Sequence, residues 1–214
     1  MNPKLTLARA LDKIVARDWP TLVVPHEIAA FEPLHKPGQR ILLAAQGLFL
    51  EVRTSFIHAI VPKTGVPLPY GQITPKITLQ QIVAKQIRAQ FEQYAADCYP
   101  MEAAAWATAV PEGAGEQCFV KLAVESASSG HITYRRPARG EYTGELLADI
   151  HSHPIGPGEF SRQDDRDDLD SKETRLAMLL DMSQTPPQWL VRVLVAGVPF
   201  FEGGTIPIAV GELP

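Results

Sequence analysis

Two histidines, a serine and an aspartate stand in a short stretch of the chain at a spacing that suits a metal ion. His151 and His153 flank a single residue, and after a seven-residue spacer Ser161 is followed three positions later by Asp164. Two imidazoles and one carboxylate form a three-ligand set for Zn²⁺ and leave a fourth coordination position for water, as a catalytic zinc site requires. The pattern therefore predicts a zinc metallohydrolase with His151, His153 and Asp164 as the metal ligands.

The neighbouring sequence predicts the elements that would hold these ligands. Residues 145–151 favour a short strand, and residues 154–158, rich in proline and glycine, favour a loop. Residues i and i+2 of a strand point to the same side, so His151 and His153 can face one metal ion while Ser152 faces away. Asp164 then has to return to the site from beyond the loop.

At this point the motif carries a family resemblance. His151-Ser152-His153-Pro154 followed by Ser161-x-x-Asp164 resembles the JAMM (MPN+) motif of zinc-dependent isopeptidases that act on ubiquitin-like proteins. The resemblance extends from about Leu79 to the C-terminus and implies an α+β, JAB/MPN-like (cytidine-deaminase-like) fold with a mixed sheet flanked by helices. Together with the strand-rich N-terminal segment, this half is most similar to the bacterial PRTRC system protein A family. That resemblance implies three partners: a ubiquitin-like substrate, an activating-enzyme-like protein and a conjugating-enzyme-like protein.

A hydrolase of this type also needs a carboxylate that takes a proton from water and passes it to the leaving amine. In the family this glutamate follows the first long helix, shortly after a proline, and Glu102 in Tyr99-Pro100-Met101-Glu102 matches that context. Glu145 would lie about 20 Å from His151 along an extended strand, which is too far. Glu125 and Glu116 remain alternatives to Glu102 as the base. The family also implies that Ser161 donates a hydrogen bond to the oxyanion.

Other residues near the motif have simpler interpretations beside functional ones. Asp164 begins an acidic run, and the other acidic residues are expected to favour the positive end of a helix dipole rather than a second metal site. Phe160 could shape a groove for an extended peptide or simply occupy the spacer. Cys98 and Cys118 lack any Cys-x-x-Cys spacing, which predicts reduced, buried thiols.

Composition limits the classes of partner. The net charge of −4 argues against a nucleic-acid-binding surface, and protein or peptide substrates fit better. No stretch approaches the ~20 apolar residues of a membrane span, and the N-terminus lacks the order of a secretory signal. The sequence thus predicts a cytoplasmic protein that binds neither membrane nor nucleic acid.

Eight prolines lie between residues 20 and 75, so the first 75 residues are predicted to form a strand-rich module and linker, with a helix only at residues 5–16. The clearest hairpin joins residues 40–45 and 48–52 across Gln46-Gly47, with a third strand at 56–61 and a linker at 63–75.

Residues 76–214 are predicted to form the catalytic domain. Its first helix would begin at a capping box of Thr78 and Gln81 and end at Tyr99. Strands are expected at 101–110, 117–125, 132–135 and 145–151, followed by helix at 162–182 and a closing hairpin of 189–196 with 198–202.

Three further functions share parts of the motif. A non-catalytic scaffold of the same fold would have lost ligands, whereas here all of them are present. A RadC-like, DNA-repair-associated protein shares the His-x-His and Ser-x-x-Asp frame, but its relatives usually carry Asn where this chain has Ser152. A zinc deaminase is disfavoured because neither His-x-Glu nor Pro-Cys-x-x-Cys occurs. The scaffold and the RadC-like protein remain the alternatives to the isopeptidase.

Overall fold

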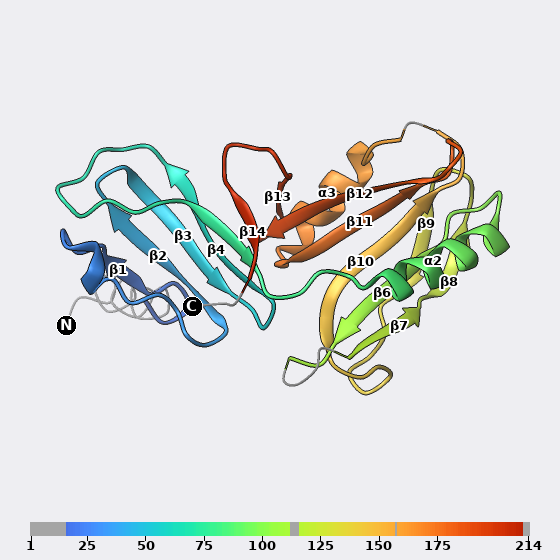
Figure 1. Cartoon of the computed structure of the whole chain (residues 1–214), viewed down its shortest axis with the longest axis horizontal. Coiled ribbons are helices and arrows are strands. Elements are labelled where there is room, and N and C mark those ends of the chain that lie inside the picture. Colours follow the sequence, from blue (N-terminus) through green and yellow to red (C-terminus); the bar gives the residue numbers. More distant parts are fainter. Residues whose placement is uncertain (1–15, 112–115, 157, 212–214) are drawn as a thin grey trace, which may run out of the picture. The chain divides into compact units, whose positions relative to one another are not determined.

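The computed structural model describes residues 16–111, 116–156 and 158–211, and its contacts divide the chain into two compact units (Figure 1). The first unit contains the residues up to Leu79 and the segment from Thr205, and the second contains Gln80–Gly204. The predicted helix at residues 5–16 lies outside the described residues except for Ala16, which is helical. The predicted division into 1–75 and 76–214 stays a prediction, and the first unit of the structure also takes in two strands beyond residue 75.

The first unit is built on a sheet with the strand order β1-β2-β3-β4-β5-β14. Its elements are β1 (Thr21–Val23), the short 3-10 helix η1 (Ile28–Ala30), β2 (Gly38–Ala44), β3 (Gly47–Arg53), β4 (Ile57–Thr64), β5 (Lys76–Leu79) and β14 (Ile208–Val210). The predicted hairpin is confirmed, because β2 and β3 pair antiparallel from Gly38 and Arg53 to Ala44 and Gly47. One hydrophobic cluster of this unit contains Val24, Leu42, Ala44, Phe49, Ile60 and Ile73.

The second unit has a mixed sheet with the order β13-β12-β11-β10-β6-β7. Its strands are β6 (Ala104–Ala109), β7 (Gln117–Lys121), β10 (Glu145–His153), β11 (Arg175–Asp181), β12 (Gln188–Val195) and β13 (Val198–Phe200). Strands β10 and β11 are parallel, and the other neighbours in this sheet are antiparallel. The α+β fold with a mixed sheet is as predicted, and so is the closing hairpin of β12 and β13.

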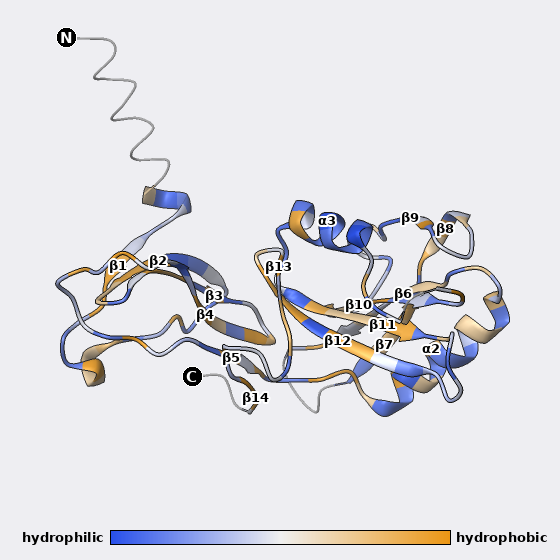
Figure 2. Cartoon of the chain, turned by 90° about the horizontal axis from the view of Figure 1, so that it is seen from above, coloured by the Kyte–Doolittle hydropathy of each residue, from blue (hydrophilic) through white to orange (hydrophobic). Residues whose placement is uncertain are grey.

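Two helices lie on opposite faces of this sheet, as Figure 2 shows. Helix α2 (Lys85–Cys98) buries Ile87, Phe91 and Ala95, and the Phe91 ring contacts Trp189 of β12. Helix α3 (Arg162–Ser171) covers the other face, beside the hairpin of β8 (Ala123–Ala127) and β9 (Ile132–Arg135). The predicted strand at 117–125 is therefore wrong in its extent, because β7 and β8 belong to different sheets.

The predicted start of the first long helix is wrong. Thr78 lies in β5, paired with His58 of β4, and α2 begins only after Ala84, which makes no side-chain capping hydrogen bond. Ile77 and Leu79 are buried while their neighbours in β5 are half-buried, so this stretch alternates as a strand does. A capping box is a local signal, and here pairing within the sheet prevails over it.

The predicted helix at residues 162–182 is also wrong beyond Ser171. The C-cap Lys172 adopts the left-handed conformation with φ 53°, and Arg175–Asp181 forms the strand β11, in which every residue is buried. A strand covered on both faces loses the alternation of apolar and polar residues, so its sequence resembles that of a buried helix.

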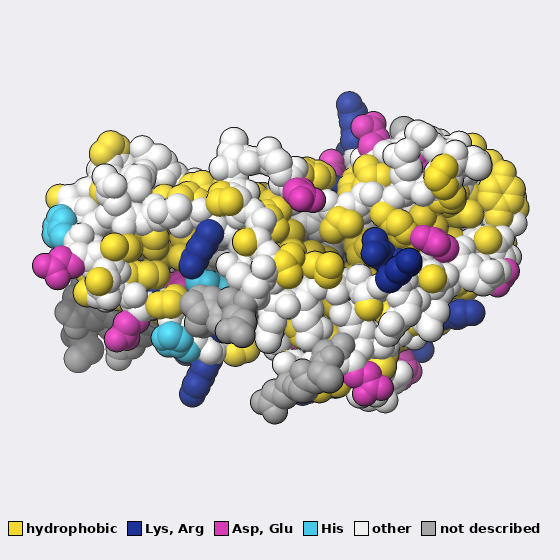
Figure 3. Space-filling view, viewed as in Figure 1, with side chains coloured by type: hydrophobic (Ala, Val, Ile, Leu, Met, Phe, Trp, Pro, Cys, Tyr) yellow, Lys and Arg dark blue, Asp and Glu magenta, His cyan; other side chains and the backbone are white. Residues whose placement is uncertain are grey.

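The surface carries few concentrated features on the face drawn in Figure 3. Hydrophobic side chains are spread over both units there, and charged side chains are scattered among the hydrophobic ones.

Cys98 and Cys118 are both free, as predicted, but they are half-buried rather than buried. No helix in the described part of the chain is long and apolar enough to cross a membrane.

Candidate metal centre

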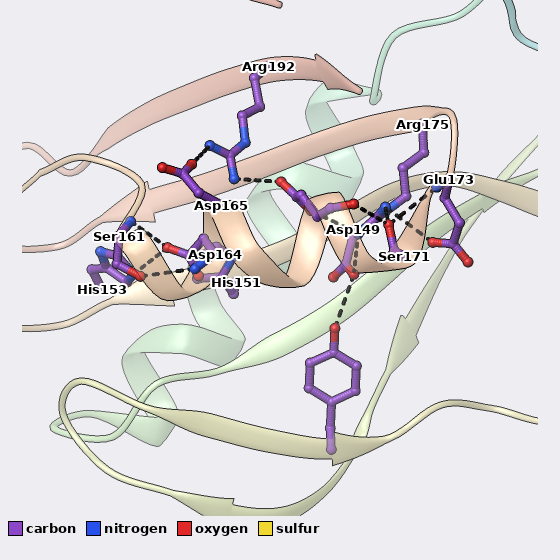
Figure 4. Close-up of polar contacts among 12 residues, drawn as sticks. Asp149, His151, His153, Ser161, Asp164, Asp165, Ser171, Glu173, Arg175 and Arg192 are labelled. Carbon is purple, nitrogen blue, oxygen red and sulfur yellow. Dashed lines mark hydrogen bonds and ion pairs between the residues drawn. The ribbon is translucent and has the colours of Figure 1, made fainter. Parts of the chain in front are cut away.

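The two histidines come from the end of β10, a central strand of the second unit. Strand β10 runs to His153, so both histidines lie within it and point to the face covered by α3 (Figure 4). Pairing with β6 on one side and β11 on the other fixes the backbone on which both imidazoles stand.

Asp164 comes from the first turn of α3 and is fixed by a capping box. Ser161 is the N-cap residue: its Oγ accepts a hydrogen bond from the Asp164 N–H at 3.2 Å, and its own N–H donates to Asp164 Oδ2 at 2.6 Å. This reciprocal pair satisfies two backbone donors at the helix start and orients the carboxylate. The residue types that form the predicted metal motif thus also begin the helix.

The three side chains converge with spacings that fit a metal ion. His151 Nε2 lies 3.4 Å from Asp164 Oδ1, and His153 Nε2 lies 3.7 Å from Asp164 Oδ2. Zinc bonds of about 2.0–2.1 Å in tetrahedral geometry place neighbouring ligand atoms about 3.3 Å apart. His151 Nε2 is buried and makes no hydrogen bond, although it faces the carboxylate. A buried nitrogen that makes no hydrogen bond and lies close to the other candidate ligand atoms fits the coordination of a metal ion.

Electrostatics within the cluster favour an ionised carboxylate. Burial alone would raise the pKa of Asp164, but its contacts with His151 and the Ser161 N–H lower that pKa far below the ordinary value. Burial alone would lower the pKa of His151, and the neighbouring Asp164 reverses the direction and raises it. The cluster therefore favours an ionised Asp164 carboxylate beside His151, and a carboxylate ligand must be ionised to hold a metal ion.

Glu102 lines the same pocket as two residues of the cluster, His153 and Asp164. A pocket between α3 and the β8–β9 hairpin is lined by Glu102, His153, Ser161 and Asp164, together with Ile132 and others. Glu102 is 6% exposed, and burial raises the pKa of its carboxyl. Glu116, Glu125 and Glu145, the other glutamates considered as a base, are exposed. Of the four carboxylates, Glu102 is thus the one that the structure brings to the cluster.

Comparison with known families identifies the second unit. Residues 83–196 match the model of the prokaryotic homologs of the JAB domain, a stretch that covers just over half of the chain and contains every residue of the cluster. The chain belongs to the prokaryotic JAB family. Residues 9–80 match a domain of unknown function (DUF2016), and searches of curated proteins and of solved structures find no match.

Within the JAB domain, Ser152 has a role that sequence reasoning missed. It is fully buried, its Oγ accepts a hydrogen bond from the Ala103 N–H at 2.9 Å, and its own N–H donates to the Ala103 carbonyl at 3.0 Å. Ala103 directly follows Glu102, so Ser152 ties the ligand strand to the segment that carries the glutamate. The position of Ser152 between two ligands was the only signal in the sequence.

In the spacer between His153 and Ser161, the backbone at Gly158 lies close to the side chain of Asp181. A Cβ added at Gly158 would lie 2.2 Å from Asp181 Oδ2, so a larger residue there would require the Asp181 carboxylate to move. Phe160, at the end of the spacer, packs edge-on against the His151 ring with 6.0 Å between centroids. To the two interpretations of Phe160 given above the structure adds a third, because its ring packs against the side chain of His151.

Proposed function

We propose that this protein is a zinc-dependent isopeptidase or protease that hydrolyses the isopeptide or peptide bond at the C-terminal tail of a ubiquitin-like protein. The observation that carries the proposal is the convergence of His151, His153 and Asp164, with the Glu102 carboxyl in a pocket that His153 and Asp164 also line. The JAB family includes metallohydrolases, and this chain retains the residues that such chemistry needs.

His151, His153 and Asp164 would hold the zinc ion. Two neutral imidazoles and one carboxylate leave the site with net positive charge and an open position. Zinc held in this way supplies a Lewis acid that lowers the pKa of water from about 16 toward 7.

Glu102 would act as the general base and then as the general acid. It accepts the proton of the attacking water and passes it to the amine that leaves. Burial raises the pKa of Glu102, which brings it nearer to the working pH and makes the second transfer easier.

Ser161 would stabilise the oxyanion that forms on the substrate carbonyl. Its Oγ accepts from the Asp164 N–H, so the hydroxyl proton stays available for donation into the pocket. A single donor of this kind contributes about 10² to 10³ in rate.

The shape of the pocket supports an extended peptide as substrate. Ile132 and Ile155 stand at its edge beside Gly130 and His131 of the β8–β9 turn, and Ile155 is 55% exposed. These residues give an otherwise polar pocket an apolar side, against which the side chains of a flexible tail could pack. The activating- and conjugating-enzyme-like partners and the PRTRC assignment stay predictions from the sequence resemblance.

The experiment that tests the proposal compares zinc content and cleavage of a ubiquitin-like protein fused through its C-terminal tail to a reporter. Glu102→Gln keeps the shape of the side chain but removes the proton acceptor, so zinc content should stay and the rate should fall by at least about 10²-fold. Glu125→Gln, in an exposed strand, should behave as the wild type. His153→Ala removes a ligand and should lose zinc as well as activity. A zinc-loaded wild type that cleaves nothing would favour the non-catalytic scaffold.

A further inference from the structure

Helix α3 is held on its sheet by charge rather than by hydrophobic packing. Of its residues, all of which the structure describes, only Asp168 is buried. Its one large hydrophobic residue, Leu169, is 50% exposed. A surface helix ordinarily docks through an apolar stripe. Other contacts must therefore position α3, and with it the ligand Asp164.

Two buried arginines make these contacts. Arg192 of β12 donates to the Asp168 carboxylate through one nitrogen and to Asp165 Oδ1 at 2.7 Å through another (Figure 4). Arg175 of β11 donates to Asp168 Oδ1 at 3.2 Å. Arg192 is 1% exposed and Arg175 is 5% exposed. We call Arg175, Arg192, Asp165 and Asp168 the arginine clamp.

The arginine clamp also reaches the strand that carries the histidines. Arg175 Nη2 lies 3.4 Å from Asp149 Oδ2, which accepts a further hydrogen bond from the Tyr134 hydroxyl at 3.0 Å. Asp149 stands two residues before His151 on β10, so both side chains point to the same face. The clamp therefore joins the row of side chains on β10 to the helix of Asp164.

A second path leads from Arg192 to a ligand through an aromatic ring. The guanidinium carbon of Arg192 lies 3.8 Å from the centroid of the Phe160 ring, within the range of a cation–π contact. The Phe160 ring in turn packs edge-on against His151. Arg192 thus contacts both the helix that carries one ligand and the ring that supports another.

We propose that Arg192 is a positioning residue of the metal centre, which holds α3 through Asp165 and Asp168 and the His151 ring through Phe160. In this way the ligands stand at metal-binding distances before the ion arrives, which is what preorganised sites require. The inference rests on the proposed function, because it takes the cluster to bind a metal ion.

The chemistry of arginine explains why this side chain stands there. A planar guanidinium can bind two carboxylates and stack on a ring at once, whereas a lysine ammonium is a point charge. Ala177, the partner of Arg192 in the β11–β12 pairing, is small and leaves space for the guanidinium. Burial raises the pKa of Asp168 despite both arginines. If Arg192 is lost, the Asp168 carboxyl can take up a proton and avoid standing as an unpaired buried charge. A variant without Arg192 is therefore expected to fold.

The test measures metal binding by the full chain in the variants Arg192→Met and Arg192→Lys. The zinc dissociation constant comes from competition with a chelator, and the visible spectrum of the Co²⁺-loaded protein reports ligand geometry. Arg192→Met should weaken zinc binding by about 10- to 100-fold, as is typical when a partner of a ligand is lost. Its Co²⁺ spectrum should change, and Arg192→Lys should fall between this variant and the wild type.

The matched control is Arg40→Met in the first unit. Arg40 is a largely buried arginine that donates to Glu51 Oε2 at 2.6 Å, so its loss should lower thermal stability and leave zinc affinity unchanged. Equal weakening of zinc binding in Arg40→Met would show a general loss of stability and overturn the proposal.

Two further outcomes separate this inference from the proposed function. Zinc affinity and Co²⁺ spectra equal to the wild type in both Arg192 variants would overturn the positioning role while leaving the metal centre intact. If Arg192→Met does not fold, Arg192→Lys decides by the same criterion. A wild type that binds neither Zn²⁺ nor Co²⁺ would refute the proposed function and this inference together.

Discussion

At the scale of single residues, three buried or partly buried carboxyl groups differ in what surrounds them. Burial raises the pKa of Glu102, which suits the general base proposed above. Asp164 faces His151 and the Ser161 N–H, which lower its pKa and keep it ionised. Glu51, in the first unit, is fully buried, and its oxygens accept from His58 Nε2 at 2.8 Å, the Leu34 N–H at 2.7 Å and Arg40.

Glu51 should make the first unit sensitive to acid. Burial alone would raise its pKa, but the hydrogen bonds from His58, Leu34 and Arg40 outweigh burial and lower the pKa below the ordinary 4.5. A lowered pKa contributes stability that is present above the ordinary value and is lost as the pH falls through the folded-state value. The transition temperature of the first unit should therefore fall as the pH is lowered below about 4.5 in calorimetry.

The variant Glu51→Gln shows which thermal transition belongs to the first unit, because only that transition should shift. It should also remove part of the pH dependence of that transition temperature. At neutral pH the substitution breaks a buried ion pair and should cost about 3 kcal/mol. Glu141→Gln is the control, since Glu141 forms an exposed pair with Arg135 and contributes little. The same slope of stability against pH in Glu51→Gln and in the wild type would contradict this account.

At the scale of elements, β10 connects the parts of the site. Its end carries both histidines, β6 beside it leads back to Glu102, and β11 leads into the arginine clamp. Ser152 is the point where β10 binds the chain next to Glu102.

Ser152→Ala should separate the position of Glu102 from metal binding. The Ala103 N–H loses its side-chain acceptor in a buried place, which costs about 1–3 kcal/mol of folding free energy. Zinc content should stay, and the cleavage rate should fall by about 10-fold or more because small displacements of a catalytic group are costly. Metal analysis, thermal unfolding and steady-state kinetics measure the three effects.

Thr108→Val on β6 is the matched control for Ser152→Ala. Thr108 is also fully buried, and its hydroxyl donates to the Thr143 carbonyl at 2.7 Å, so its loss should lower stability. If both variants lose the same share of activity, the effect of Ser152 is one of stability alone.

At the scale of the whole molecule, the chain crosses between its two units twice. It leaves the first unit after β5 and returns to it as β14, which pairs parallel with β5 from Ile208 and Ile77 to Val210 and Leu79. The C-terminal strand therefore completes the sheet of the first unit, although it follows the JAB domain in sequence.

This connectivity predicts different behaviour for two fragments. A fragment of residues 80–204 contains His151, His153 and Asp164, the proposed ligands, and should be monomeric and bind zinc. A fragment of residues 76–214 also carries β5 and β14 without their sheet, and unpaired strands with apolar side chains promote association. Size-exclusion chromatography with light scattering should show aggregates of the longer fragment only. A fragment 80–204 without a cooperative thermal transition would show that the JAB domain depends on the first unit.

Sequence alone predicted that His151, His153 and Asp164 lie together, and it predicted the elements with strong local signals. His151 and His153 share a face because side chains alternate along a strand. The hairpins β2–β3 and β12–β13 follow from apolar runs separated by two-residue turns, at Ala45-Gln46, one residue before the predicted Gln46-Gly47, and at Ala196-Gly197. These features depend on residues close together in the chain, so their geometry can be predicted without knowing the tertiary structure.

Tertiary structure decided what depends on distant segments. Arg175–Asp181 is a strand because β10 and β12 pair with it on both sides, and Thr78 is in a strand because β4 pairs with it, although local patterns favoured helix in both places. The arginine clamp joins residues of β11 and β12 to α3, and Ser152 binds Ala103 some fifty positions earlier in the chain. Such contacts follow from sheet pairing, and a single sequence does not encode them as a local pattern.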